Sequence, residues 1–251
     1  MIIYFSATGN SRHVARQIAA QTHDTVMSIE DFPAGKAPII DIAPGERLGF
    51  VFPVYFLKVC QPMAEFIQRA VISAASDTYV YTGATYGSFT GMSARDAEEL
   101  LASKGVKLRA SFSVKMPDTW TPMFDLSDAA KVAQINRAAD EALAEVIKQI
   151  AFNATGDHSN NHLPRLFSEA YCAIGLPMST KTKNFTVDAD SCTSCGLCAK
   201  RCPAQAIKML DGAPVWEKGS CYACLRCLHY CPKFAIQYGK NTAAHGQYRH
   251  P

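Results

Sequence analysis

Eight of the ten cysteines in this 251-residue chain lie between positions 192 and 231, whereas Cys60 and Cys172 stand alone earlier in the sequence. The eight form two copies of the pattern Cys-x2-Cys-x2-Cys-x3-Cys-Pro, and each cysteine of the second copy follows its counterpart by 29 positions. Ala206 and Ala235 continue this offset beyond the cysteines, so the segment is an internal duplication. Short segments rich in Cys, Gly and Pro cannot bury a large apolar core, and we therefore expect bound metal to stabilise this region.

The spacing predicts two 4Fe-4S clusters bound as in bacterial ferredoxins, where the fourth cysteine of each run ligates the other cluster. The predicted ligands of one cluster are Cys192, Cys195, Cys198 and Cys231. The predicted ligands of the other are Cys202, Cys221, Cys224 and Cys227. A pair of zinc sites is the alternative, because zinc ligands also come as Cys-x2-Cys pairs. It leaves the third cysteine and the proline of each run unexplained.

Composition and the first residues indicate a reducing compartment. The chain is 48% hydrophobic and 19% charged, as in ordinary globular proteins. Residues 1–5 carry no basic segment and run directly into polar residues, which does not fit a signal peptide, and no window of about 18 apolar residues predicts a membrane span. We therefore expect a cytoplasmic protein whose cysteines bind metal rather than form disulfides. For Cys60 and Cys172 we expect inert packing.

Strand and helix patterns alternate through the first 154 residues. Apolar runs predict strands at residues 2–5, 48–54, 78–82 and 108–114, and amphipathic patterns predict helices at 11–21, 61–74, 91–104 and 126–152. This alternation predicts an α/β domain with a parallel sheet covered on both faces. Residues 155–163 read as an exposed loop, followed by a short helix at 164–174. The predicted domains are 1–154, a helical linker at 155–180, and a cysteine-rich domain at 181–251.

The first predicted strand ends in a loop suited to binding an anion. Small hydroxyl residues and a glycine precede a helix there, so unpaired N–H groups, hydroxyls and the positive end of the helix dipole converge. The candidate phosphate-binding residues are Ser6, Thr8, Gly9, Asn10 and Ser11. Capping of the helix by Asn10 or Ser11 is the alternative reading.

Two further loops follow predicted strands at the same edge of the sheet, where open parallel sheets bind ligands. The candidate residues in these loops are Pro53, Val54, Tyr55 and Phe56, and Thr85, Tyr86 and Gly87. Each loop offers an aromatic ring for stacking and exposed backbone for hydrogen bonds to a planar heterocycle. Ordinary loop packing is the alternative for Tyr55 and Phe56. Together the three loops predict a site for flavin mononucleotide (FMN).

The first loop resembles the flavodoxin phosphate loop, Ser/Thr-x-Thr-Gly-Asn-Thr/Ser, from Ser6 to Ser11. Over residues 1 to about 240, and again in the tail at 247–251, the chain is similar to the ferrodoxin family, in which a flavodoxin-like domain is fused to a two-cluster ferredoxin domain. The resemblance implies bound FMN, a doubly wound five-stranded parallel sheet in the order 2-1-3-4-5, a small α+β ferredoxin domain and a role in electron transfer. The third loop departs from flavodoxins, which tend to have an acidic Gly-Asp segment there.

The cofactors predict a function. FMN exchanges one or two electrons and each cluster one, so the chain is suited to convert between paired and single electrons. We expect an electron-transfer protein that exchanges electrons with a redox partner protein in anaerobic metabolism. The alternative is a ferredoxin-dependent reductase acting on a small planar acceptor such as a quinone or nitro compound, suggested by the aromatic residues around Tyr55 and Trp120. No Gly-x-Gly-x-x-Gly motif predicts a nicotinamide site.

The two parts of the chain differ in formal charge. Residues 181–251 contain ten Lys or Arg and four Asp or Glu, hence +6, and residues 1–180 carry −3. Two clusters with eight thiolates would leave the cysteine-rich part at about +2, which favours an acidic partner such as a ferredoxin, flavodoxin or oxidoreductase. An equal alternative is that the Lys and Arg residues of this part only neutralise the negative charge of the clusters. A net charge of +3 without long basic runs does not favour nucleic acid. A homodimer stays an alternative, in which the flavin and cluster domains are brought closer across a subunit interface.

Overall fold

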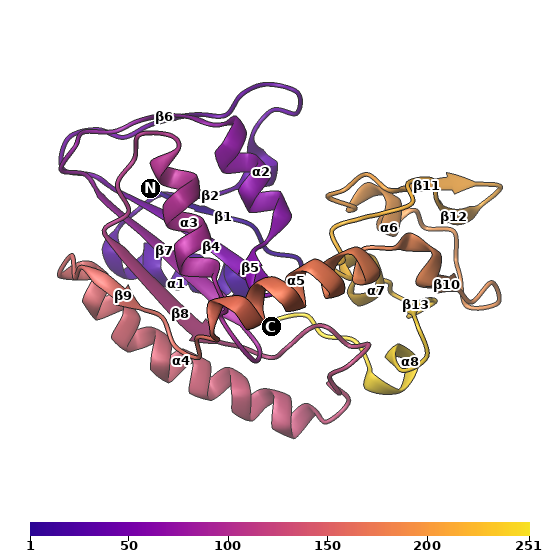
Figure 1. Ribbon diagram of the computed structural model, residues 1–251. Coiled ribbons are helices and arrows are strands. Elements are labelled where there is room, and N and C mark those ends of the chain that lie inside the picture. The colour runs from indigo at the N-terminus through magenta and orange to yellow at the C-terminus, as the bar shows by residue number, and fades with distance from the viewer.

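Six strands of the main sheet lie side by side in the order β2-β1-β4-β7-β8-β9 and are all parallel. The computed structural model describes residues 1–251 (Figure 1). These strands are β1 Ile2–Tyr4, β2 Val26–Ser28, β4 Arg47–Tyr55, β7 Tyr79–Tyr86, β8 Ala110–Lys115 and β9 Gly156–His158. Counted along the chain, the first five have the order 2-1-3-4-5, which confirms the predicted flavodoxin-like topology. A seventh strand, β5 Lys58–Val59, forms a hairpin with β4.

Helices cover both faces of this sheet. On one face lie α1 Asn10–Thr22 and α4 Ala129–Ala151, and on the other lie α2 Gln61–Arg69 and α3 Ser93–Ala102. Side chains alternate along each strand, so Ile2 and Val51 join the core beneath α1 and α4, while Ile3 and Phe50 join the core beneath α2 and α3. The sheet is therefore buried on both faces, as parallel sheets require.

Several predicted boundaries were wrong. The helix predicted at 61–74 ends at Arg69, because residues 71–73 form a short strand, β6 Val71–Ser73, parallel to β3 Ile39–Asp41. The loop predicted at 155–163 contains β9, whose three residues are exposed and pair with β8 through the backbone, with the His158 ring stacked on that of Phe112. The helix predicted at 164–174 is longer, α5 Arg165–Ser179, and contains Pro177.

The cysteine-rich part consists of small elements around few buried residues. Two antiparallel pairs are formed by β10 Phe185–Val187 with β13 Ile236–Tyr238, and by β11 Ile207–Leu210 with β12 Ala213–Trp216. The helices are α6 Leu197–Lys200, α7 Arg226–His229 and α8 Thr242–His245, and a 3-10 turn occupies Thr182–Asn184. A further 3-10 turn, Ile29–Asp31, follows β2 in the first part of the chain. The apolar core of the cysteine-rich part has only five buried residues, which fits a domain that depends on bound metal.

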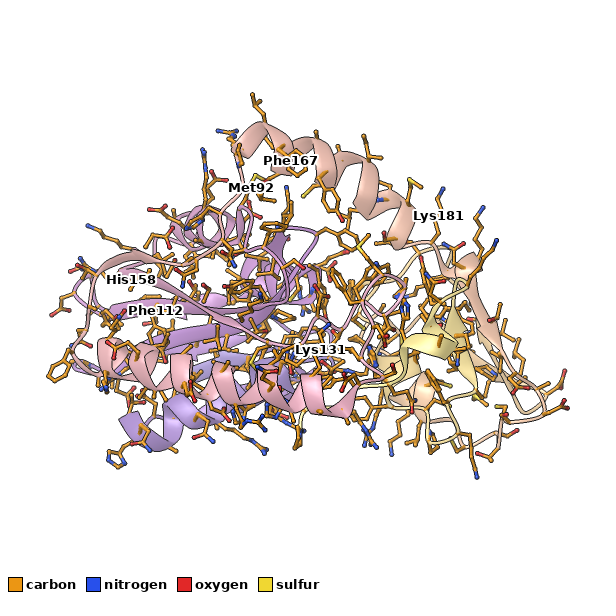
Figure 2. The ribbon with its side chains drawn as sticks, turned by 90° about the horizontal axis from the view of Figure 1, so that it is seen from below. Met92, Phe112, Lys131, His158, Phe167 and Lys181 are labelled. Carbon is orange, nitrogen blue, oxygen red and sulfur yellow. The ribbon has the colours of Figure 1, made fainter.

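The two parts contact each other through a bridging helix and the C-terminus. Figure 2 shows α5 running from Phe167, beside the main sheet, to the segment at Lys181, beside the cysteine-rich part. In Figure 1 the chain end returns from α8 towards the main sheet. The predicted boundaries at residues 154 and 180 stay predictions.

Candidate cofactor sites

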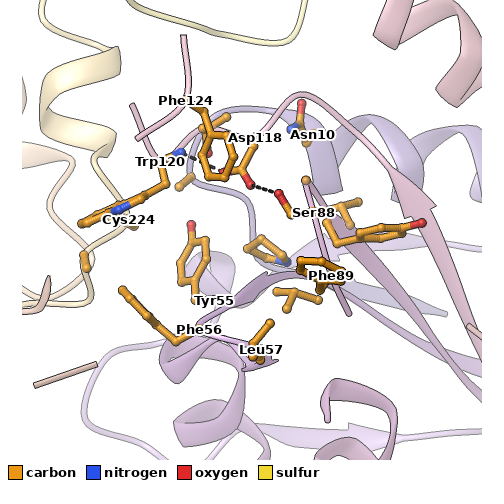
Figure 3. Close-up of a pocket in the computed structure, with 18 of the residues that line it drawn as sticks. Asn10, Tyr55, Phe56, Leu57, Ser88, Phe89, Asp118, Trp120, Phe124 and Cys224 are labelled. Atoms are coloured by element: carbon orange, nitrogen blue, oxygen red, sulfur yellow. Dashed lines mark hydrogen bonds between the residues drawn. The ribbon is translucent and has the colours of Figure 1, made fainter. Parts of the chain in front are cut away.

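A large cavity, of about 460 Å³, opens at the carboxyl ends of β1, β4, β7 and β8 (Figure 3). This volume lies in the range of sites that bind small organic ligands. Eleven of the twelve residues predicted to contact FMN line it, so the structure brings the three predicted loops together. Gly9 is the exception, because it lies beside the C-terminal residue His250.

The first loop leaves the start of α1 open to an anion. Gly9 has φ 108° and donates its N–H to the Ser6 hydroxyl at 3.0 Å. No side chain caps the helix, so the alternative of a simple cap by Asn10 or Ser11 is wrong. The backbone N–H groups of Asn10, Ser11 and Arg12 have no acceptor within the protein. The free donors and the helix dipole therefore provide the features that favour binding of an anion such as a phosphate group.

The second loop is the tip of the β4–β5 hairpin. Phe56 and Leu57 have φ of 49° and 64°, a conformation that bulky residues rarely adopt and that costs free energy. Cys172 Sγ donates to the carbonyl oxygen of Phe56 at 2.6 Å, and the Met92 N–H donates to that of Leu57 at 2.7 Å. These contacts hold Tyr55 and Phe56 against the cavity, where both are half-buried and Tyr55 also packs against the core beneath α2 and α3.

The third loop meets a fourth, of which the sequence pointed only to Trp120. Residues 117–120 follow β8 and bring Asp118 to the cavity, where a Cβ on Gly87 would overlap its side chain. The Trp120 N–H and the Ser88 hydroxyl donate to the Asp118 carboxylate at 3.1 and 3.3 Å. Burial raises the pKa of Asp118. An acidic side chain thus lies beside the third loop, although that loop has none in its sequence. The rule that ligands bind at carboxyl ends of parallel strands points to this fourth loop as well.

Aromatic side chains complete the cavity wall. Phe56 packs edge-on against Trp120, with ring centroids 5.8 Å apart. Phe167 and Tyr171 of α5 also line the cavity, a contribution that no sequence motif signals. In Figure 3, Cys224 reaches the cavity from the cysteine-rich side, opposite Phe89.

Each predicted set of four cysteines lines a cavity of its own. Cys192, Cys195, Cys198 and Cys231 line one. Cys202, Cys221, Cys224 and Cys227 line the other. The fold therefore brings the fourth cysteine of each run to the other run, as the spacing predicts. No group of His, Cys, Asp and Glu side chains is placed to hold a single metal ion.

The backbone near the cysteines supplies hydrogen bonds to sulfur. The N–H groups of Ala206 and Ala235 donate to the sulfurs of Cys202 and Cys231, both at 3.3 Å. These alanines are the duplicated positions outside the cysteine pattern, and N–H bonds to sulfur are one means by which a protein sets cluster potentials. Gly196, with φ 70°, begins α6 in the first run.

The two cysteine cavities differ in their surroundings. Cys224 lines both its own cavity and the large cavity, and burial raises its pKa to about 12. Cys195, in the other set, is exposed. The set with Cys224 therefore lies next to the large cavity, while the set with Cys195 faces solvent.

Comparison with protein families assigns both parts. The sequence model of the family described as Flavodoxin domain matches residues 1–142, more than half of the chain. The chain belongs to the flavodoxin family. A second model, described as 4Fe-4S dicluster domain, matches residues 184–232 and spans all eight clustered cysteines. The cofactors are therefore FMN and two 4Fe-4S clusters, and the protein combines a flavin with iron–sulfur clusters for electron transfer, as the sequence predicts.

The chain also has a distant similarity to a solved structure. A solved structure, rubredoxin oxygen:oxidoreductase from the anaerobe Desulfovibrio gigas, is 17% identical with a TM-score of 0.33 and covers 61% of this chain. The match spans 36% of that protein. No curated protein sequence matches the chain. No helix is long and apolar enough to cross a membrane, and the cytoplasmic location stays a prediction.

Proposed function

We propose that the protein carries electrons between a redox partner protein and FMN through its two clusters in a fixed order. The outer cluster would be held by the set with Cys195, and the inner cluster by the set with Cys224. The observation that carries this order is that Cys224 lines both the inner-cluster cavity and the flavin cavity. An exposed Cys195 favours electron exchange with a partner at the outer cluster.

The residues around the flavin cavity have separable roles in this proposal. The free N–H groups at the start of α1 would bind the FMN phosphate, and Tyr55 and Trp120 would contact the ring system. Bound FMN supplies the change between one- and two-electron steps. Tyr55 and Cys224 both line the flavin cavity. This proximity supports a short separation between flavin and inner cluster.

We further propose an acidic redox protein, such as a ferredoxin or flavodoxin, as the partner. The formal charge of +6 on residues 181–251 supports this choice, since a positive surface accelerates association with a negative one. The metabolic setting we propose is anaerobic, because a cluster bound by an exposed cysteine such as Cys195 is open to attack by oxygen.

The test uses the reconstituted holoprotein under anaerobic conditions. Reduced ferredoxin should bleach the flavin band, whereas NADH or NADPH alone should not. Cys195→Ser should perturb the outer cluster and slow flavin reduction by ferredoxin at least about tenfold, while a small chemical reductant still reduces the flavin. Thr193→Ala, in the same exposed loop, is the matched control. Electron paramagnetic resonance would show whether the Cys195→Ser protein has lost the outer cluster. If that protein still reduces flavin with ferredoxin at the wild-type rate, the proposed order of electron transfer is contradicted.

A second function is favoured by the rim of the flavin cavity. Met123, Phe167, Tyr171 and Phe89 line it and are 64, 57, 44 and 46% exposed. An open apolar rim suits a planar acceptor such as a quinone or nitro compound, reduced at the flavin with electrons from ferredoxin. The same anaerobic assay distinguishes the two functions, since rapid multiple turnover of such a compound would favour the reductase.

A further inference from the structure

The C-terminal tail, residues 247–251, lies against the loop proposed to bind phosphate. The Tyr248 hydroxyl donates to Asn10 Oδ1 at 2.8 Å and lies 3.1 Å from Asn136 Oδ1. The Asn10 side chain in turn donates to the carbonyl oxygen of Pro117 at 3.2 Å. Both Tyr248 and Asn10 are buried. Asn10, the first residue of α1, is thus held in place by the opposite end of the chain.

A second contact of the tail is with the turn before α1. The N–H of His250 donates to the carbonyl oxygen of Thr8 at 2.9 Å. A Cβ on Gly9 would come within 2.8 Å of His250 Cβ, so the tail fits closely against this glycine. The His250 ring stacks on that of His13 in α1, with centroids 4.1 Å apart. The tail therefore supports the phosphate loop from outside the cavity.

The tail is anchored to the cluster domain at its other end. The Gln247 side-chain amide donates to the carbonyl oxygens of Leu228 and Cys231 at 2.6 and 2.8 Å. The Tyr248 N–H donates to Nδ1 of His229 at 3.1 Å. A continuous series of hydrogen bonds therefore runs from the loop of a predicted cluster ligand to the first turn of α1.

We propose that Tyr248 is a positioning residue for the FMN phosphate site, and that Gln247 keeps it in place from the cluster domain. This inference rests on the proposed function, in which the start of α1 binds the phosphate. The tail does not line the cavity. It acts by holding Asn10 and Thr8, so that the free N–H groups of the first turn point at the phosphate without reorganisation on binding.

A comparison of FMN with riboflavin measures this role, because riboflavin has the same ring system but no phosphate. Tyr248→Phe keeps the ring packing and removes the hydrogen bond to Asn10. We expect its Kd for FMN to rise about three- to tenfold, the range that one neutral hydrogen bond supports. Its Kd for riboflavin should stay unchanged. Gln247→Ala should show a smaller effect of the same kind, and a chain ending at Gln247 a larger one.

The measurement is flavin binding by fluorescence quenching to protein that retains both clusters, judged by their absorption. Tyr79→Phe is the matched control, because its buried hydroxyl bonds to the carbonyl oxygen of Ala154 far along the chain from the phosphate loop. It should leave both Kd values unchanged. Equal losses of FMN and riboflavin affinity in Tyr248→Phe, or no loss of either, would overturn the inference. If wild-type protein binds FMN no better than riboflavin, the proposed phosphate site itself is wrong.

Discussion

Asp118 is the acidic side chain that the structure adds to the flavin cavity. It is half-buried, and only a backbone N–H and one hydroxyl donate hydrogen bonds to its carboxylate. A partly buried carboxylate without a cation beside it is costly to ionise, so its pKa lies above the ordinary value. A negative charge at this place opposes the addition of electrons to a flavin and lowers the flavin potential.

Asp118→Asn should therefore raise the flavin midpoint potential at neutral pH, by roughly 40 mV for a one-electron step if the repulsion is about 1 kcal/mol. The size of this difference depends on pH. Above the raised pKa the wild-type carboxyl is charged, so the midpoint potentials of wild type and Asp118→Asn differ. As pH falls through that pKa the carboxyl becomes neutral, and the difference in potential should vanish. Spectroelectrochemical titration from pH 5 to 8 measures this. Asp125→Asn, at an exposed carboxylate outside the cavity, should leave the potential unchanged at every pH.

Among the elements, the β4–β5 hairpin is where local conformation and site chemistry conflict. Two-residue hairpin loops with positive φ favour Asn and Gly, whereas this one has Phe56 and Leu57. The tertiary contacts from Cys172 and Met92 compensate for this conformation. Strained residues of this kind collect at binding sites, which fits the position of Phe56 against Trp120.

Phe56→Asn should separate the backbone strain at this position from the contribution of the aromatic ring to flavin binding. Relief of backbone strain should keep the free energy of unfolding unchanged or raise it by up to about 1 kcal/mol. Loss of the aromatic ring should raise the Kd for FMN and for riboflavin, each at least about fivefold. Urea unfolding and flavin titration are the measurements. Gln205→Asn, an exposed residue with φ 47° outside the flavin cavity, is the control and should not alter flavin binding. Unchanged flavin affinity in Phe56→Asn would remove Phe56 from the site.

Across the whole molecule, one buried arginine joins the two domains. The Arg226 guanidinium, two residues after Cys224, pairs with both oxygens of Glu30 and donates to the carbonyl oxygen of Ser6 at 2.7 Å. The Arg226 side chain is 8% exposed, that of Glu30 43%. The inner-cluster loop is thereby attached to the strand end that begins the phosphate loop.

Glu30→Gln removes the charge that pairs with Arg226 and should lower the free energy of unfolding by about 1–2 kcal/mol, less than for a fully buried pair because Glu30 is partly solvated. Thermal unfolding of the holoprotein measures the change. Glu217→Gln, in the exposed pair with Lys208, should change stability by less than about 0.5 kcal/mol. Equal shifts in both variants would show that the Arg226 pair contributes no more than a surface pair.

Where residues close in the sequence form a recognisable pattern, the sequence predicted which side chains the fold brings together. The cysteine spacing predicted both ligand sets across the duplication, and the run from Ser6 to Ser11 predicted the anion site, since backbone geometry there depends on neighbouring residues. The order of the five main strands followed from the family resemblance. The edge strand β9 was missed because exposed polar residues pair through the backbone and show no apolar alternation.

Contacts between distant segments required the folded chain. Asp118 beside Gly87 depends on how β7 and β8 align, and the Tyr248 bond to Asn10 joins residues 238 positions apart. The adjacency of Cys224 to the flavin cavity depends on how the two domains pack together. Local spacing specifies which atoms bind a cofactor, whereas the distances between cofactors arise from packing that no local pattern encodes.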